Sequence, residues 1–153
     1  MAWSRIVSKV VLWLVFSASI PCAAGDFFER AGVALDGYDP VSYFTEQKPV
    51  VGVKEFTAEY KGSVFHFASK ANRDHFLAAP DNYAPQYDGF CAYGTAQGYK
   101  AKIDPAAFSI VDGKLYLNYN ASVQKEWSKD RSGTIARADS KWPNVSKLAK
   151  VIP

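Results

Sequence analysis

The chain has 153 residues, of which 48% are hydrophobic and 22% are charged, and its formal net charge is +3. This length suits one globular domain, and no repeat, low-complexity tract or long linker divides the sequence. Two of the 18 basic residues and none of the 15 acidic residues lie in the first 24, so the remainder has a net charge of +1. A charge this small gives no support for nucleic-acid binding.

Residues 1–24 have the order of a signal peptide. Arg5 and Lys9 form a basic end, an apolar run covers residues 10–20, and small residues follow up to position 25. The apolar run is about half the length that a membrane-spanning helix needs, so we expect cleavage and no stable membrane anchor. The alternatives are an uncleaved anchor and a lipoprotein modified at Cys22, although Pro21 suits lipoprotein cleavage poorly. The sequence therefore predicts a periplasmic or secreted protein with one domain over residues 25–153.

Residues 25–35 carry few structural signals, and we expect them to wrap the surface. Asp39 followed by Pro40 is typical of a helix start, because aspartate caps well and proline is tolerated at the first helical position. This pair predicts a short helical turn over residues 40–45.

A hairpin followed by a helix is predicted next. Residues 55–60 and 64–67 are rich in strand-forming side chains and flank a turn that contains glycine. Ser69 is a suitable cap for a helix over residues 70–79, which Pro80 would end. The apolar face of this helix comprises Ala71, Phe76 and Ala79.

The segment after Pro80 mixes aromatic residues with glycine and proline. We expect a loop up to Gly89, followed by a short helix over residues 91–97 that Gly98 ends. Cys91 would then stand at the start of this helix.

A second hairpin has the clearest local signal in the sequence. Residues 108–111 and 114–117 flank the dipeptide Asp112-Gly113, which is favoured in two-residue turns.

Two helices are predicted after this hairpin. Asn120 is a suitable cap for a helix over residues 121–129, and a further helix is expected over residues 133–141, closed by Pro143. Together these elements predict an α+β fold, a small single domain with two β-hairpins and several short helices.

Few side chains could bind a metal ion. Cys91, His66 and His75 are the available sulfur and imidazole ligands, whereas zinc prefers three or four such ligands in a tetrahedron. They lack the short spacing of a usual metal motif, so only the fold could bring them together. Strand alternation places His66 on the face opposite Phe65 and Phe67, and each histidine could equally be a structural residue. Possible hard ligands are Asp39, Asp74 and Asp88.

Cys91 is the only thiol once the leader is removed, so no internal disulfide can form. Backbone N–H groups and the helix dipole at a helix start would lower the pKa of this thiol and raise its reactivity. Tyr87, Phe90 and Tyr93 lie close to it in sequence, and we expect them to form aromatic walls of a ligand or cofactor site. The alternatives are a cysteine that packs as a small apolar residue and rings that only fill the core.

Four blocks of sequence carry a resemblance to a known family. The blocks are GYDPVSYF at 37–44, FHFAS at 65–69, YDGFCA at 87–92 and DGKLYLNY at 112–119. Together they resemble the YHS domain family over residues 37–143, and more narrowly its exported bacterial branch, in which some relatives carry selenocysteine at the position of Cys91. The resemblance implies a treble-clef-like hairpin-helix unit and a relation to metal-binding modules. It also implies a role for Cys91 in redox chemistry or in binding a soft metal ion.

The sequence departs from the metal-handling relatives at three positions. Those relatives carry cysteine where this chain has Ser42, Ala68 and Asn72. A hydroxyl, a methyl and an amide cannot replace three thiolates, so the metal site of those relatives is not expected here.

The functional hypothesis is an exported binding module that holds a soft metal ion, such as copper or zinc, or a small ligand near Cys91. One alternative is a thiol-based redox enzyme or sensor, in which the oxidised Cys91 is reduced by an external thiol because no second cysteine is present. The other is a structural domain that binds a protein partner. The sequence leaves open whether the protein is an enzyme.

Overall fold

The structure is a computed structural model that describes residues 25–153. The predicted signal peptide lies outside the described residues. In chain order the elements are β1 (Glu29–Arg30), β2 (Val33–Ala34), η1 (Leu35–Gly37), α1 (Ser42–Thr45), β3 (Val53–Tyr60), β4 (Ser63–Phe67), α2 (Lys70–Ala78), α3 (Pro80–Tyr83), η2 (Gln86–Gly89), α4 (Ala92–Gln97), β5 (Lys100–Ala101), β6 (Asp104–Val111), β7 (Lys114–Asn118), α5 (Ala121–Lys129), α6 (Arg131–Val145) and β8 (Val151–Ile152).

The predicted hairpin β3–β4 is present and pairs antiparallel, with Tyr60 opposite Ser63 beside the turn. Alternation along β4 places Phe65 and Phe67 in the core, where both are fully buried, while His66 between them is half-buried. The hairpin therefore presents an aromatic face to the interior, as the sequence pattern predicts.

Helix α2 begins after Ser69, whose side chain accepts a hydrogen bond from the backbone N–H of Asn72. Phe76 is fully buried against Phe65 and Phe67 of the hairpin. Ala71 is exposed, so the predicted apolar face is wrong at this position. The helix packs on the hairpin through the ring of Phe76, whereas Ala71 in its first turn faces solvent.

The second predicted hairpin is formed by β6 and β7, with Val111 opposite Lys114. Asp112 and Gly113 have φ values of 50° and 71°, which is the left-handed backbone of a two-residue turn. The turn brings Leu115 into the core with no exposed surface.

Both C-terminal helices begin at a capping side chain. Asn120 and Asp130 each accept a hydrogen bond from a backbone N–H in the first turn, at 2.9 and 3.0 Å. Helix α6 is longer at both ends than the predicted span 133–141 and continues through Pro143. The helix ends two residues after the proline, so the missing N–H removes only one backbone bond near the terminus.

Two segments that were expected to lack regular structure have it. Residues 80–89 contain α3 and the 3₁₀ helix η2, where a loop was predicted. Residues 25–35 form the small ladder β1–β2, and Phe27 and Phe28 are buried rather than on the surface. Their rings pack edge-on against Phe65 and Phe90, contacts that a local sequence pattern does not reveal.

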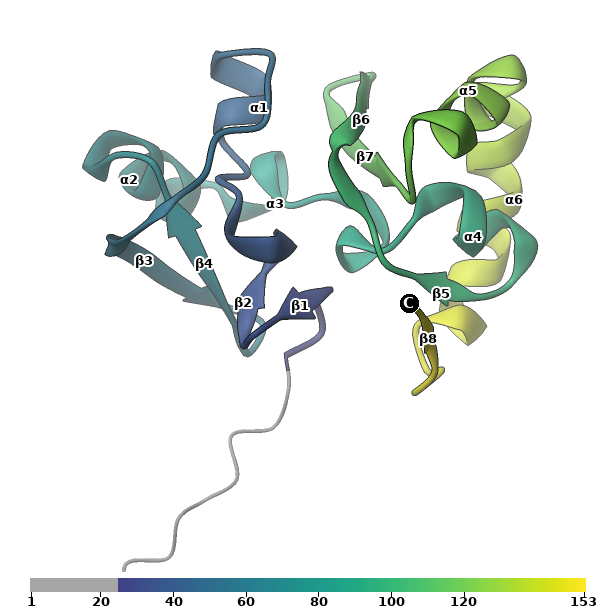
Figure 1. The fold of residues 1–153 in the computed structure, drawn as a ribbon, viewed down its shortest axis with the longest axis horizontal. Helices are drawn as coiled ribbons and strands as arrows, with labels where there is room; N and C mark the ends of the chain where they lie inside the picture. The colour runs from purple at the N-terminus through teal and green to yellow at the C-terminus, as the bar shows by residue number, and fades with distance from the viewer. Residues whose placement is uncertain (1–24) are drawn as a thin grey trace, which may run out of the picture.

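Figure 1 shows β1–β4 with α1–α3 on one side of the molecule and α4–α6 with β5–β8 on the other. Every sheet within residues 25–153 has two strands, and β5 pairs with β8 in parallel. One core cluster joins the two sides through residues such as Phe28, Phe90 and Leu115, and a smaller one surrounds Trp127. The prediction of a small α+β domain is confirmed. None of the helices in this part of the chain has the length and apolar character needed to cross a membrane.

Candidate functional site

Cys91 is the N-cap residue of α4, where the chain leaves η2. Its φ of −54° and ψ of 118° are not helical, and its Sγ accepts a hydrogen bond from the backbone N–H of Gly94 at 3.4 Å. Its own backbone N–H donates to the carbonyl of Ala101 at 3.1 Å, which fixes Cys91 beside β5. The helix ends at Gly98, which has a left-handed φ of 102°, so the predicted short helix is confirmed.

The Cys91 thiol is buried, with an exposed fraction of 1%, and it donates towards Oδ1 of Asn118 at 3.8 Å. Burial raises the pKa of the thiol, and the backbone N–H groups of Gly94, Tyr119 and Tyr93 offset this rise only in part. The expectation of a lowered pKa is therefore wrong. Helix α4 has only six residues, and the loss of hydration outweighs its dipole.

The sulfur lines a small cavity, here called the Cys91 cavity. Its volume is about 190 Å³, and its wall comprises Cys91, Tyr99, Ala101, Tyr119, Val123 and Ile152. Tyr99 and Ile152 are 39% and 37% exposed, so the mouth lies at these two side chains. Pockets for drug-sized ligands hold roughly 300–1,000 Å³, so this cavity suits a smaller ligand.

Strand β8 covers one side of the Cys91 cavity. Ile152 accepts a hydrogen bond through its carbonyl from the N–H of Lys102 at 2.9 Å. The Tyr119 hydroxyl donates to the carbonyl of Pro153 at 2.9 Å. These bonds hold the strand beside β5, where the Ile152 side chain completes the wall.

Most of the wall could not be found from the sequence, because its residues come from separate segments. One signal was present at Gly94. A Cβ atom added there would lie 2.8 Å from Cε2 of Tyr99, so the absence of a side chain lets this ring lie close against α4. A glycine three residues after Cys91 thus indicated a close contact, but not the identity of its partner.

The three aromatic residues predicted to form ligand walls lie elsewhere. Tyr87 belongs to the smaller core cluster, and its hydroxyl donates to Asp139 at 2.8 Å. Phe90 is 5% exposed and packs edge-on against Phe28. Tyr93 approaches the sulfur through its backbone N–H. None of these three rings is part of the wall of the Cys91 cavity.

The structure does not bring His66 and His75 to Cys91. His66 lies on β4 and His75 is exposed on α2, across the molecule from α4 in Figure 1. Within residues 25–153, no three histidine, cysteine, aspartate or glutamate side chains are grouped so that they could hold a metal ion. The described part of the chain therefore supplies no ligand set of the kind that zinc prefers.

The three positions at which metal-handling relatives carry cysteine do converge, around Asp39. Its carboxylate is fully buried and accepts hydrogen bonds from the N–H groups of Val41 and Ala68, both at 2.8 Å, and from the Asn72 amide at 2.6 Å. The Ser42 hydroxyl donates to the Asp39 carbonyl at 2.8 Å. The carboxylate is already engaged by three donors and no thiolate is present, so these residues do not fit a metal ion.

Comparison with known proteins identifies one part of this architecture. Residues 41–87 match the profile of the YHS domain. Searches of curated proteins and of solved structures gave no match. The matched segment runs from α1 through the β3–β4 hairpin and α2 into η2, contains the Asp39 neighbours, and ends before Cys91. Residues 41–87 of the chain are therefore similar to the YHS domain.

Proposed function

We propose that this protein is an exported binding module that holds one small, soft ligand in the Cys91 cavity. The position of the sulfur carries the proposal, because the only free thiol among the described residues lines a largely apolar cavity of about 190 Å³. A cysteine that only fills the core is surrounded by close-packed atoms and has no such space beside it. The association of YHS domains with metal binding supports a binding role.

Copper(I) fits this cavity better than zinc does. Thiolate ligands favour copper(I), whereas zinc prefers three or four protein ligands, and the cavity offers one sulfur. A copper ion would therefore arrive with a second, external ligand that occupies the remaining space. Binding would displace the thiol proton, so the affinity should increase with pH.

A copper(I) titration tests the proposal in the full chain carrying Cys22→Ala, which leaves Cys91 as the only thiol. Bound copper is measured under anaerobic reducing conditions in competition with a colorimetric chelator. We expect one copper ion per chain, lost in Cys91→Ser and retained when His66 and His75 are both replaced by alanine. Uptake that survives Cys91→Ser would contradict the proposed site.

A second candidate function is a thiol redox enzyme or sensor. The backbone N–H groups of Gly94, Tyr93 and Tyr119 near the sulfur would stabilise a thiolate. In this reaction the thiolate attacks a peroxide oxygen, the O–O bond breaks, and water or an alcohol leaves. The sulfenic acid on Cys91 is then reduced by an external thiol.

The raised pKa of the Cys91 thiol places this candidate second, because attack on a peroxide needs the free thiolate, whereas copper(I) displaces the thiol proton as it binds. Trapping of the sulfenic acid after peroxide treatment, followed by mass spectrometry, distinguishes the two functions. A thiol that neither takes up copper nor reacts with peroxide in the folded chain would leave only a structural domain that binds a partner.

A further inference from the structure

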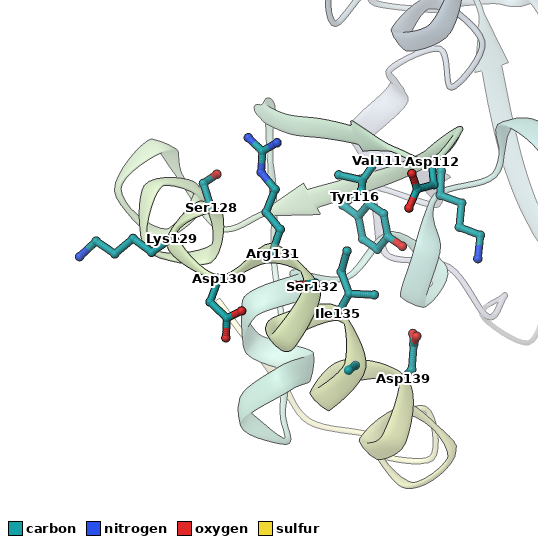
Figure 2. A pocket seen from close by; sticks show the side chains of 12 residues that line it. Val111, Asp112, Tyr116, Ser128, Lys129, Asp130, Arg131, Ser132, Ile135 and Asp139 are labelled. Carbon is teal, nitrogen blue, oxygen red and sulfur yellow. The ribbon is translucent and has the colours of Figure 1, made fainter.

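A second cavity, here called the Tyr116 groove, lies between the tip of the β6–β7 hairpin and the start of α6 (Figure 2). Its volume is about 630 Å³, and it shares no wall residue with the Cys91 cavity. The hairpin, the end of α5 and one side of α6 contribute to it. The wall comprises Val111, Asp112, Lys114, Tyr116, Ser128, Lys129, Asp130, Arg131, Ser132, Ile135, Ala136 and Asp139.

Tyr116 is the buried polar residue of this groove. It is 3% exposed, and its ring packs on Trp127 with 5.5 Å between centroids. Its hydroxyl points into the space between Asp112 and Asp139 (Figure 2). Burial and the charges of these two carboxylates raise the pKa of Tyr116, and no hydrogen bond from another described residue contributes.

A buried hydroxyl usually has a hydrogen-bond partner, as the hydroxyl of Tyr87 has in Asp139. The Tyr116 hydroxyl has no such partner within residues 25–153 and faces a cavity large enough for a ligand. The hydroxyl oxygen is open to the groove, so it is free to donate a hydrogen bond to a polar group that enters there.

Among the charged wall residues, Lys129 pairs with Glu126 and Asp130 pairs with Arg137, and the remaining charges differ between the two ends of the Tyr116 groove. Asp112 and Asp139 stand on either side of the Tyr116 hydroxyl and would attract a cation. Arg131 rises from the first turn of α6 at the other end (Figure 2). It lies over the ring of Trp127 at 5.8 Å and forms no ion pair with another described residue, so it can receive an anion.

The space between the two ends is lined in part by apolar side chains. Val111 approaches from the hairpin and Ile135 from α6 (Figure 2), and Ala136 of α6 also belongs to the wall. A ligand that is charged at both ends and apolar in the middle therefore complements this groove.

We infer that the Tyr116 groove binds a short peptide with free ends, its ammonium group between Asp112 and Asp139 and its carboxylate at Arg131. The Tyr116 hydroxyl can donate a hydrogen bond to a carbonyl oxygen of the peptide. The volume lies within the usual range of roughly 300–1,000 Å³ for ligand pockets, which limits the peptide to a few residues. This inference is independent of the function proposed for Cys91.

The test uses the full chain and the tripeptide alanyl-leucyl-alanine, followed by amide chemical shifts in NMR. We expect shifts confined to residues 112–116 and 128–139. Acetylation of the amine or amidation of the carboxylate should each weaken binding by about tenfold, since each removes a charge-assisted contact. Absence of shifts at these residues, or equal affinity for the blocked peptides, would overturn the inference.

Point variants separate the contributions of the individual groups. Tyr116→Phe keeps the ring and should weaken binding by about fivefold, the effect of one neutral hydrogen bond. Arg131→Gln should lower the affinity for the free peptide and leave the affinity for the amidated peptide unchanged. Lys147→Gln removes the same charge from an exposed residue outside the groove and should have no effect. An equal loss in Lys147→Gln and Arg131→Gln would show a nonspecific charge effect and would contradict the assignment.

Substitution of Lys114 should have the opposite effect on peptide affinity. It is an exposed wall residue two positions before Tyr116 on β7, where its ammonium group competes for the acidic end. Lys114→Gln should therefore tighten binding of the free peptide, and a weakened complex would place the peptide amine elsewhere.

Discussion

Cys91 and Asp39 are both buried, but their polar atoms have different surroundings. The carboxylate of Asp39 is held by three N–H donors at 2.6–2.8 Å, which leaves it no room for another partner. The Cys91 sulfur has one backbone donor at 3.4 Å and open space on one side. A carboxylate with three short hydrogen bonds acts as a fixed structural group, whereas a neutral thiol beside a cavity can accept a new partner.

The first prediction concerns the reactivity of Cys91. In the folded Cys22→Ala chain, iodoacetamide should modify Cys91 several-fold more slowly at pH 8 than it does in urea, because the sulfur is buried and its raised pKa leaves less of the reactive thiolate. Above the pH at which the alkylation rate of an ordinary thiol becomes constant, the rate for Cys91 should still increase. Mass spectrometry of the alkylated chain provides the measurement, and equal rates in the folded and unfolded chain would show that the thiol is neither buried nor shifted.

The second prediction concerns Asp39. Asp39→Asn replaces an acceptor oxygen with an amide that faces other donors, so it should lower the free energy of unfolding by about 2–4 kcal/mol in urea denaturation. Asp74→Asn on the exposed side of α2 is the matched control; it weakens only exposed ion pairs with Lys70 and Arg73 and should shift the midpoint much less. A metal requirement for folding would contradict the structural role given to Asp39.

Individual elements followed the sequence wherever a local signal specified them. Asp112-Gly113 predicted a hairpin turn because both positions need a left-handed backbone, and Asn120 predicted a helix start because its side chain caps the first turn. The elements that were missed depend on distant contacts. Phe27 and Phe28 are buried because residues far along the chain provide their partners. Helix α3 begins at Pro80 itself, where the sequence predicts the start of a loop.

The third prediction contrasts two glycines on different elements. Gly113→Ala puts a side chain at a φ of 71° with free space around it, so it should cost about 1 kcal/mol of stability and leave copper uptake unchanged. Gly94→Ala would press on the Tyr99 ring at the cavity mouth. Alkylation of Cys91 should therefore become faster in this variant, while the urea midpoint changes little. The reverse pattern would mean that Tyr99 does not control access to the thiol.

At the scale of the whole molecule, the candidate site lies outside the segment that matches the YHS domain. The family match ends at residue 87, and the Cys91 cavity is built by α4, β5, β8 and the segment around Tyr119. Sequence reasoning identified Cys91 but associated it with His66 and His75, because residue types suggest ligand sets and say nothing about distance. The cavity wall depends on the parallel pairing of β5 with β8, which joins residues about 50 positions apart and has no local pattern.

The fourth prediction tests the cover provided by β8. Ile152→Ala shortens a partly exposed side chain in the wall, so alkylation of Cys91 should become several-fold faster with little change in stability. Leu148→Ala is the matched control, since Leu148 is 41% exposed and does not line the Cys91 cavity. Equal rates in the two variants would show that solvent reaches the sulfur by another route.

The hydrogen bond from the Tyr119 hydroxyl to Pro153 has a practical consequence for handling this protein. It holds the Pro153 carbonyl beside Tyr119, a wall residue of the Cys91 cavity, so an affinity tag or fusion partner attached after Pro153 would begin close to the entrance to the thiol and would change the access of reagents to it.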